Sequence, residues 1–542
     1  MTSALTVNGQ TVNPAYRYEG KNATVSAWPG SGVGDTLAIS GSGLAPTLNQ
    51  ATPLLTGTDV SVKFNGNAGA GNQYFQAATS GPSAVGNVDT EDMVLEMLVA
   101  HDGVGPSLWR GFLSTRDFSR SSQGYWLQNL GSLDQSFVFQ MGDGATILSM
   151  NAVDGGLLSI KDAWYHVLVF IDHSDAGTST GRMYINGRFI TSGSTPTVVG
   201  SAVSNLGLSI GADPNGGFDS GAGVAYAAMW KQNNWFAGGA SNATQWDAIA
   251  ADRFARLSGV QTPGVTPDFT RAGVASTDID GKQFLVGPHW PRMARRAGIA
   301  GFLSETVATN RILQSEDFST SWTATATVVT TNTSVAPNDR TTADRIVATA
   351  GSLYQAVTLV ASTQYTASVW IRSTSGTNQN VSVTVQNAST SATVAAVPIV
   401  IGAAWSRVTL TFTTPTGVTG YRVGFGAGTY DIQAWGFQLE TGGMASSYLP
   451  TTTTTASRAA DVLKYTGVSV PLKGTLAADL VATSATLIGF TAAVSDGTLE
   501  NEVVLYTSNG ISTAAVKRTD VFEALIPGGD ISGVLRRQAI TY

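Results

Sequence analysis

The stretch AWYHVLVFIDHSDAGTSTGRMYINGRFI, residues 163–190, decides the fold of the first half of the chain. It starts with an aromatic-led apolar run, passes through a polar loop and ends in two short apolar runs that flank Asn186-Gly187. Asn-Gly between two apolar runs is a strong hairpin signal, because both turn residues must tolerate positive φ. The stretch therefore predicts antiparallel strands joined by a tight turn.

Alternation of apolar and polar residues extends this pattern along the chain. Examples are VSVKFNG at 60–66, LGLSIGA at 206–212, YTASVWIRS at 365–373, VSVTVQN at 381–387 and SRVTLTFTT at 406–414. A period of two turns one face of each segment to a core and the other to water. We therefore expect an all-β protein of tandem antiparallel β-sandwich (jelly-roll) domains. The one expected helix is 244–259, which Thr244 would cap and Gly259 would end.

The length of 542 residues predicts three or four folded units. Prolines and glycines after residue 260 mark one boundary, and the threonine run at 451–455 marks another. We expect a first sandwich at 1–259, a short β-rich collar at 260–307, a second sandwich at 308–455 and a truncated β domain at 456–542. The last segment is short for a complete sandwich and would leave sheet edges open for assembly.

The composition excludes several classes of function. Charged residues make up only 12% of the chain, the formal net charge is −7, and there is no cysteine. These values argue against a nucleic-acid partner, disulfides and cysteine-containing metal sites. No apolar run is long enough to span a bilayer, and the opening MTSALTVNGQ shows no export signal, so we expect no membrane insertion.

The first sandwich resembles laminin-G-like, or concanavalin-like, jelly rolls. The resemblance spans roughly 15–258 and rests on the opening stretch together with LGLSIGAD at 206–213 and GVAYAAMW at 223–230.

The second sandwich resembles a carbohydrate-binding-module-like jelly roll of structural proteins in tailed bacteriophages and prophages. The segments that carry this resemblance are TNRILQSEDFSTSWT at 309–323 and DIQAWGFQLETGGMASSYLP at 431–450. FTRAGVASTDIDGKQFLVGPHW at 269–290 is similar to the collar that precedes this module. In LSETVATN at 303–310, Glu305 and the Thr-Asn pair of the family pattern are kept, but its second acid and its arginine are missing.

These resemblances imply a virion protein: a tail fibre, a spike or a head decoration that binds a host-surface glycan or receptor. They also imply location in the virion, other virion proteins as partners, and a homo-oligomer, most simply a trimer. We expect the collar residues Phe284, Leu285, Val286, Ile299 and Phe302 to contribute to that assembly. A purely structural scaffold is one alternative.

The other alternative is a depolymerase of capsule or lipopolysaccharide. Asp92 and Glu96 in EDMVLEMLV would supply its two carboxylates, although a solvated strand face explains them better. No nucleophile-base motif or phosphate-binding motif occurs, and only four histidines are present. We therefore expect no catalytic residues and no enzymatic activity.

Aromatic residues in polar, loop-like settings are the candidate glycan contacts, because sugar rings stack on exposed aromatic faces. They are Trp109, Tyr125, Trp126, Trp235 and Phe236. Five other tryptophans alternate with polar residues and should point into a core: Trp164, Trp230, Trp370, Trp405 and Trp435.

The loop GADPNGGFDSGAG at 211–223 is the candidate metal site. Its Asp213, Asn215 and Asp219 could supply oxygen ligands to a structural calcium ion. An ordinary turn-rich connection is the reading we favour, and we expect no other cofactor.

Overall fold

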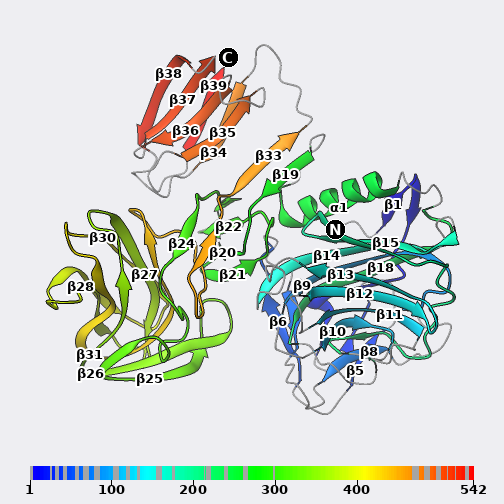
Figure 1. The fold of residues 1–542 in the computed structure, drawn as a ribbon, viewed down its shortest axis with the longest axis horizontal. Helices are drawn as coiled ribbons and strands as arrows, with labels where there is room; N and C mark the ends of the chain where they lie inside the picture. The colour runs from blue at the N-terminus through cyan, green and yellow to red at the C-terminus, as the bar shows by residue number, and fades with distance from the viewer. Residues whose placement is uncertain are drawn as a thin grey trace.

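The computed structural model is an all-β assembly with a single α-helix among its described residues (Figure 1). It describes residues 4–24, 27–30, 36–40, 45–54, 60–64, 73–77, 86–101, 109–116, 123–130, 135–153, 162–173, 177–212, 214, 221–236, 242–260, 266–296, 299–466, 475–480, 489–495, 502–508, 511–518, 521–530 and 536–541. No helix in the described part of the chain has the length and apolar character needed to cross a bilayer.

The first sandwich consists of two facing antiparallel sheets with a shared core. One sheet runs β13 (Ile147–Val153), β12 (Gln135–Asp143), β11 (Gln123–Leu130), β10 (Trp109–Ser114), β17 (Ser209–Ile210), β8 (Tyr74–Ala77), β5 (Leu37–Ser40), β4 (Ala27–Trp28). The other contains β14 (Ala163–Asp172), β9 (Asp92–Ala100), β18 (Gly223–Gln232), β7 (Val60–Lys63), β6 (Thr47–Ala51), β3 (Tyr16–Glu19), β15 (Thr180–Ile185) and β16 (Arg188–Ser194). A hairpin of β1 (Leu5–Val7) and β2 (Gln10–Val12) and a short 3-10 turn (Gly20–Asn22) complete the unit.

The predicted hairpin and helix are both present. β15 and β16 meet at Asn186 and Gly187, whose φ angles are +52° and +74°. Helix α1 (Asn242–Ser258) starts two residues before the expected position, so Thr244 lies inside it rather than at its cap, and Gly259 follows it at φ +81°. The helix covers the outer face of the second sheet, where Trp246 stacks on Phe170 at 5.2 Å between ring centroids.

The collar continues the sheet of the first sandwich. Its strands are β19 (Thr266–Thr270), β20 (Ala275–Ile279), β21 (Lys282–Val286), β22 (Met293–Arg296), β23 (Ile299–Phe302), β24 (Ala308–Asn310), β32 (Ala456–Arg458) and β33 (Val462–Thr466). β21 lies parallel to β14, while β19 pairs with β33 and β24 pairs with β32. The strands that follow the threonine run therefore return to the collar.

The collar residues expected at an oligomer interface are partly used within the chain. Phe284 and Val286 are buried, and Leu285 packs against the core of the first sandwich. Phe284 and Val286 are therefore core residues of one copy of the protein, which corrects the expectation that they form an open assembly surface. Phe302 is half-buried and packs on Phe269 at 5.7 Å between ring centroids. The side chain of Ile299 lies outside the described residues.

The second sandwich is built around two long strands that serve both of its sheets. The strands are β25 (Thr323–Val335), β26 (Thr341–Thr358), β27 (Gln364–Ser373), β28 (Gln379–Asn387), β29 (Thr393–Ile401), β30 (Ser406–Thr413) and β31 (Gly420–Thr441). The first half of β31 pairs with β28 and its second half pairs with β27. β26 changes register with β31 at Gly351, where a Cβ would collide with the carbonyl oxygen of Ala326. Only glycine fits this close backbone approach.

The tryptophans of the second sandwich form a small cluster apart from its main core. Trp370 and Trp435 are buried on the face of their strands that points away from the main core, where they pack with Tyr448. Trp405 is only half-buried, which corrects its expected place in the core. Trp164 and Trp230 of the first sandwich are buried as predicted.

The C-terminal segment forms further antiparallel strands (Figure 1). β34 (Thr475–Leu480) pairs with β39 (Arg536–Thr541), and β35 (Gly489–Ser495), β36 (Glu502–Ser508), β37 (Ile511–Arg518) and β38 (Val521–Asp530) form a four-stranded sheet.

Candidate functional site

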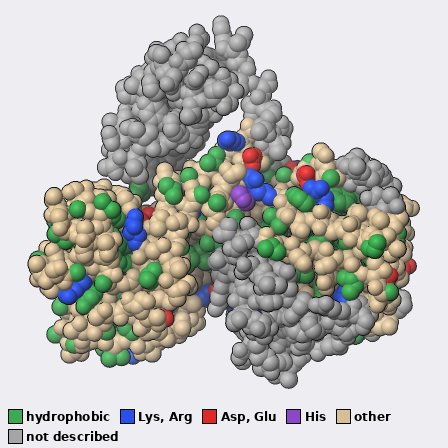
Figure 2. Space-filling model, viewed as in Figure 1, with side chains coloured by type: hydrophobic (Ala, Val, Ile, Leu, Met, Phe, Trp, Pro, Cys, Tyr) green, Lys and Arg blue, Asp and Glu red, His purple; other side chains and the backbone are tan. Residues whose placement is uncertain are grey.

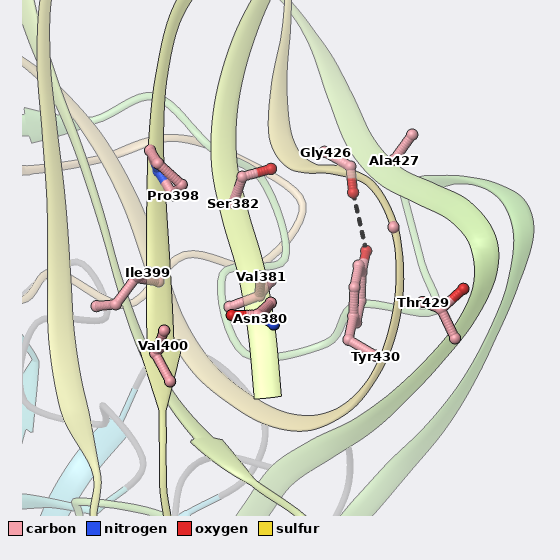
Figure 3. Close-up of a pocket in the computed structure, with 11 residues that line it drawn as sticks. Asn380, Val381, Ser382, Pro398, Ile399, Val400, Gly426, Ala427, Thr429 and Tyr430 are labelled. Atoms are coloured by element: carbon pink, nitrogen blue, oxygen red, sulfur yellow. Dashed lines mark hydrogen bonds between the residues drawn. The ribbon is translucent and has the colours of Figure 1, made fainter. Parts of the chain in front are cut away.

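A pocket of about 410 Å³ opens on the second sandwich where β31 leaves β28 (Figure 3). The last paired residues of the two strands are Val383 and Phe425. Beyond them β31 stays paired with β26 and then joins β27, and the space between it and β28 becomes the pocket. Its lining residues are Asn380, Val381, Ser382, Pro398, Ile399, Val400, Gly426, Ala427, Gly428, Thr429 and Tyr430.

Glycines make this course of β31 possible. A Cβ on Gly426 would collide with Ser382 Oγ, and a Cβ on Gly424 would collide with the carbonyl oxygen of Leu353. The run GFGAGTY at 424–430 therefore lets β31 pass close to both neighbouring strands.

The floor of the pocket pairs polar and apolar side chains across two strands. Asn380 lies opposite Val400, and Ser382 lies opposite Pro398. The side chains of Asn380 and Ser382 make no hydrogen bond to any residue that the structure describes. Val400 is 60% exposed, so its apolar side chain is open to contact from outside the protein. The floor thus offers hydrogen-bonding groups beside apolar carbon atoms.

Tyr430 closes the inner wall. Its hydroxyl donates a hydrogen bond to the carbonyl oxygen of Gly426 at 3.4 Å (Figure 3). Burial raises the pKa of Tyr430, so the hydroxyl stays protonated and uncharged at neutral pH. None of the eleven lining residues carries a charge. Uncharged donors and acceptors beside apolar carbon suit a neutral ligand rich in hydroxyl groups.

Charged side chains are sparse on the visible face of the second sandwich (Figure 2). Figure 2 shows them singly or in small groups over the visible face of the second sandwich, among uncharged side chains.

The aromatic residues predicted to contact a glycan lie elsewhere, in the first sandwich. Tyr125, Trp235 and Phe236 are fully buried, and Trp126 is 3% exposed. Trp235 and Phe236 stack on one another at 5.1 Å between centroids, in the cluster beneath helix α1. Buried rings present no face to a sugar. These four residues are therefore part of the hydrophobic core and do not form the glycan contacts expected from the sequence. Trp109 lies in β10, and its side chain is outside the described residues.

The predicted calcium ligands Asp213, Asn215 and Asp219 also lie outside the described residues. Within the described part of the chain, no group of three His, Asp or Glu side chains is arranged to hold a metal ion.

The carboxylates of Asp92 and Glu96 do not form a paired-acid site. Four residues along a strand separate the two positions by about 13 Å, beyond the roughly 5 to 10 Å of glycosidase pairs. Glu96 is buried and bound by Arg253 of α1, whose Nε lies 2.8 Å from Oε1, and by His166 Nε2, also at 2.8 Å. Asp92 accepts the backbone N–H groups of His173 and Phe236, both at 2.8 Å. Both acids serve the packing of the first sandwich.

The comparisons with known proteins bear on the second sandwich. Residues 310–431 match the family model described as a carbohydrate binding domain. The match covers most of the strands that build the pocket, including all of its lining residues. A comparison with curated proteins finds no match.

Several solved structures show a low similarity. The enzymatically active domain of tailspike protein 4 from bacteriophage CBA120 shares 16% identity over 24% of this chain and 21% of that chain, with a TM-score of 0.20. Domain 4 of the arabinanase AbnA from Geobacillus stearothermophilus shares 14% identity over 44% of this chain and 98% of its own, with a TM-score of 0.29. The binding domain of botulinum neurotoxin DC shares 8% identity over 76% of this chain and 98% of its own, with a TM-score of 0.32. At these TM-scores the likeness carries no inference about function.

Proposed function

We propose that the second sandwich binds carbohydrate in the pocket between β28, β29 and β31. The observation that carries this proposal is the coincidence of two findings. The family match to a carbohydrate binding domain spans 310–431, and the pocket lies entirely within those residues. Its volume of about 410 Å³ also falls within the range of about 300–1,000 Å³ that is usual for small-molecule sites.

The side chains of the pocket define how a sugar would sit. Asn380 and Ser382 would exchange hydrogen bonds with ring hydroxyl groups, since neither is engaged by another described residue. Pro398 and Val400 would pack against the apolar C–H face of the ring, and this contact would cover the exposed part of Val400. The uncharged lining favours a neutral sugar unit at this position.

We further propose that the whole chain is a virion component of a tailed phage or prophage, as a tail fibre, spike or head decoration that attaches to a host-surface glycan. The order of the sequence segments supports this: a laminin-G-like segment, a collar and a carbohydrate-binding-module-like segment follow one another in 15–258, 269–290 and 309–450. Other virion proteins and further copies of the chain, in a trimer, would be its partners. A calcium ion at 211–223 stays a prediction.

Binding to glycans by the full-length protein tests the proposal. The double variant Asn380→Ala/Ser382→Ala should lose binding on a glycan array and in calorimetry with the best neutral oligosaccharide found there. Ser389→Ala, an exposed change in the β28–β29 turn, is the matched control and should bind like the wild type. Unchanged affinity of the double variant, or no glycan binding by the wild type, would overturn the proposal.

Experiments on purified phage particles distinguish an attachment protein from a structural scaffold and from a depolymerase. Antibody labelling should place the chain on the virion surface. A purely structural scaffold would be present in the particle and bind no glycan, and a depolymerase would release reducing ends from host polysaccharide.

A further inference from the structure

Arg372 is a half-buried cation without a carboxylate partner on the outer face of the second sandwich. In β27 its neighbour Ile371 points into the core, so alternation turns Arg372 outward. Its Nε donates to Gln433 Oε1 at 2.5 Å, and its guanidinium carbon lies 4.7 Å from the centroid of the Trp405 ring. Among the described residues, no acceptor binds its two terminal nitrogens and no carboxylate lies within 4.0 Å.

The neighbouring arginine on the same face is different. Arg345 forms two hydrogen bonds with Asp431, at 2.9 and 2.6 Å, and its charge is neutralised within the protein. Partial burial lowers the pKa of Arg372, whereas the Asp431 carboxylate raises the pKa of Arg345. Arg372 therefore bears the cost of partial desolvation without the compensating charge that Arg345 has.

The orientation of the Arg372 side chain is already fixed. The hydrogen bond to Gln433 and the contact with Trp405 hold the guanidinium plane from two sides. Its terminal nitrogens are left with unused donors, and the amide nitrogen of Gln433 also has no acceptor among the described residues. A planar guanidinium with two parallel donors matches a carboxylate, and less side-chain entropy is lost because the group is held before the ligand arrives.

We propose that Arg372, with Gln433 beside it, binds the carboxylate of an acidic sugar such as a uronic acid. The chain as a whole has a net charge of −7, so long-range electrostatics would not attract an anion, and the specificity must come from this local cation. The inference rests on the proposed carbohydrate binding by the second sandwich and adds to it the class of sugar. It assigns a contact separate from the uncharged pocket between β28, β29 and β31.

A pair of matched oligosaccharides tests this inference with the full-length protein. One contains glucuronic acid, and the other is the same oligosaccharide with its carboxyl groups reduced to alcohols. The wild type should bind the acidic form about 10- to 100-fold more tightly, as expected for a charge-assisted bidentate contact. Arg372→Gln should abolish that preference and leave the affinity for the reduced form unchanged.

Arg345→Gln is the matched control, because it removes the same charge from the same face without touching Arg372. It should keep the preference. Arg372→Lys retains charge without the planar fork and should show an intermediate preference; it also serves if Arg372→Gln fails to fold, as judged by circular dichroism.

The outcomes distinguish this inference from the proposed function. Equal affinity for both oligosaccharides overturns the acidic-sugar inference and leaves carbohydrate binding standing. Equal losses in Arg372→Gln and Arg345→Gln, or tighter binding of a glutamate-rich peptide than of the acidic oligosaccharide, also overturn it. No binding to either oligosaccharide or to any glycan overturns both proposals.

Discussion

Arg271 and Asp461 lie 190 residues apart in the sequence, yet Nη1 of Arg271 donates to Oδ1 of Asp461 at 3.2 Å, and neither side chain has any exposed area. Asp461 also pairs with Arg292. Glu305 in turn binds Arg292 at 2.7 Å and Arg458 at 2.6 Å. This network joins the collar to the segment that follows the second sandwich, and so ties both ends of that sandwich to the collar.

Asp461→Asn should destabilise the protein strongly, because it leaves two buried guanidinium groups without their shared carboxylate. Removing one partner of a buried pair costs about 3–5 kcal/mol. Urea unfolding followed by tryptophan fluorescence measures the loss. Asp268→Asn breaks the exposed pair with Arg188 and should cost no more than about 1 kcal/mol. Equal effects of the two substitutions would show that the network contributes little.

Glu305 should make the stability of the folded protein fall as the solution becomes acidic. Although burial opposes ionisation, the nearby Arg292 and Arg458 lower the pKa of Glu305 to about 2 in the folded protein. A carboxyl group with a depressed folded pKa contributes stability at neutral pH, and this contribution is lost as the pH falls from its unfolded pKa of about 4.3 toward 2. Glu305→Gln should therefore be less stable than the wild type at pH 7 and approach it near pH 2. Melting temperatures of the two proteins, measured from pH 7 to pH 2, check this. A difference between them that stays the same at every pH would contradict the role given to Glu305.

Trp435→Ala should cost about 3–5 kcal/mol, because its ring is buried against Trp370 and Tyr448. Trp405→Ala should cost clearly less, since this ring is half-buried and its Nε1 donates to the carbonyl oxygen of Val335 at 3.2 Å. Calorimetric melting of the full-length variants ranks the two. The reverse order would mean that the cluster on the outer face is assigned wrongly.

Gly426→Ala should weaken sugar binding by about tenfold or more, because its Cβ would enter the space beside Ser382 that the pocket needs. A stability loss of about 1–3 kcal/mol should accompany it as the strands move apart. Gly420→Ala on the same strand is the control for both affinity and stability. The only atom near its added Cβ is the Cβ of Ala388, at an ordinary contact distance of 3.5 Å. Calorimetric titration gives the affinity, and an unchanged value for Gly426→Ala would place the sugar elsewhere.

Much of the fold could be predicted because it depends on local patterns. The Asn186-Gly187 turn and the helix near 244–259 follow from backbone preferences and apolar spacing, which act over a few residues. Glu305, which the sequence singles out in LSETVATN, binds two arginines of the network that joins the collar to the segment after the second sandwich. Arg458, which binds it, comes from a strand 153 residues away, a contact that spacing alone could not reveal.

The candidate site could not be predicted in the same way. Trp235 sits among polar residues, but the chain folds it under helix α1, so a polar sequence setting did not mean exposure. The pocket arises where β31 changes its partner strand, and its floor is Asn380, Ser382 and Val400, which read in sequence as ordinary alternating strand residues. The glycine-rich run at 424–430 was the one sequence signal of a close strand approach.

The most direct test of carbohydrate binding is a crystal structure of the full-length protein with the neutral oligosaccharide that it binds best. We expect a sugar ring between Asn380, Ser382 and Val400, with hydrogen bonds to the first two side chains and its C–H face on the third. A sugar bound to the first sandwich, or a second sandwich that stays empty at saturating oligosaccharide, would contradict this account.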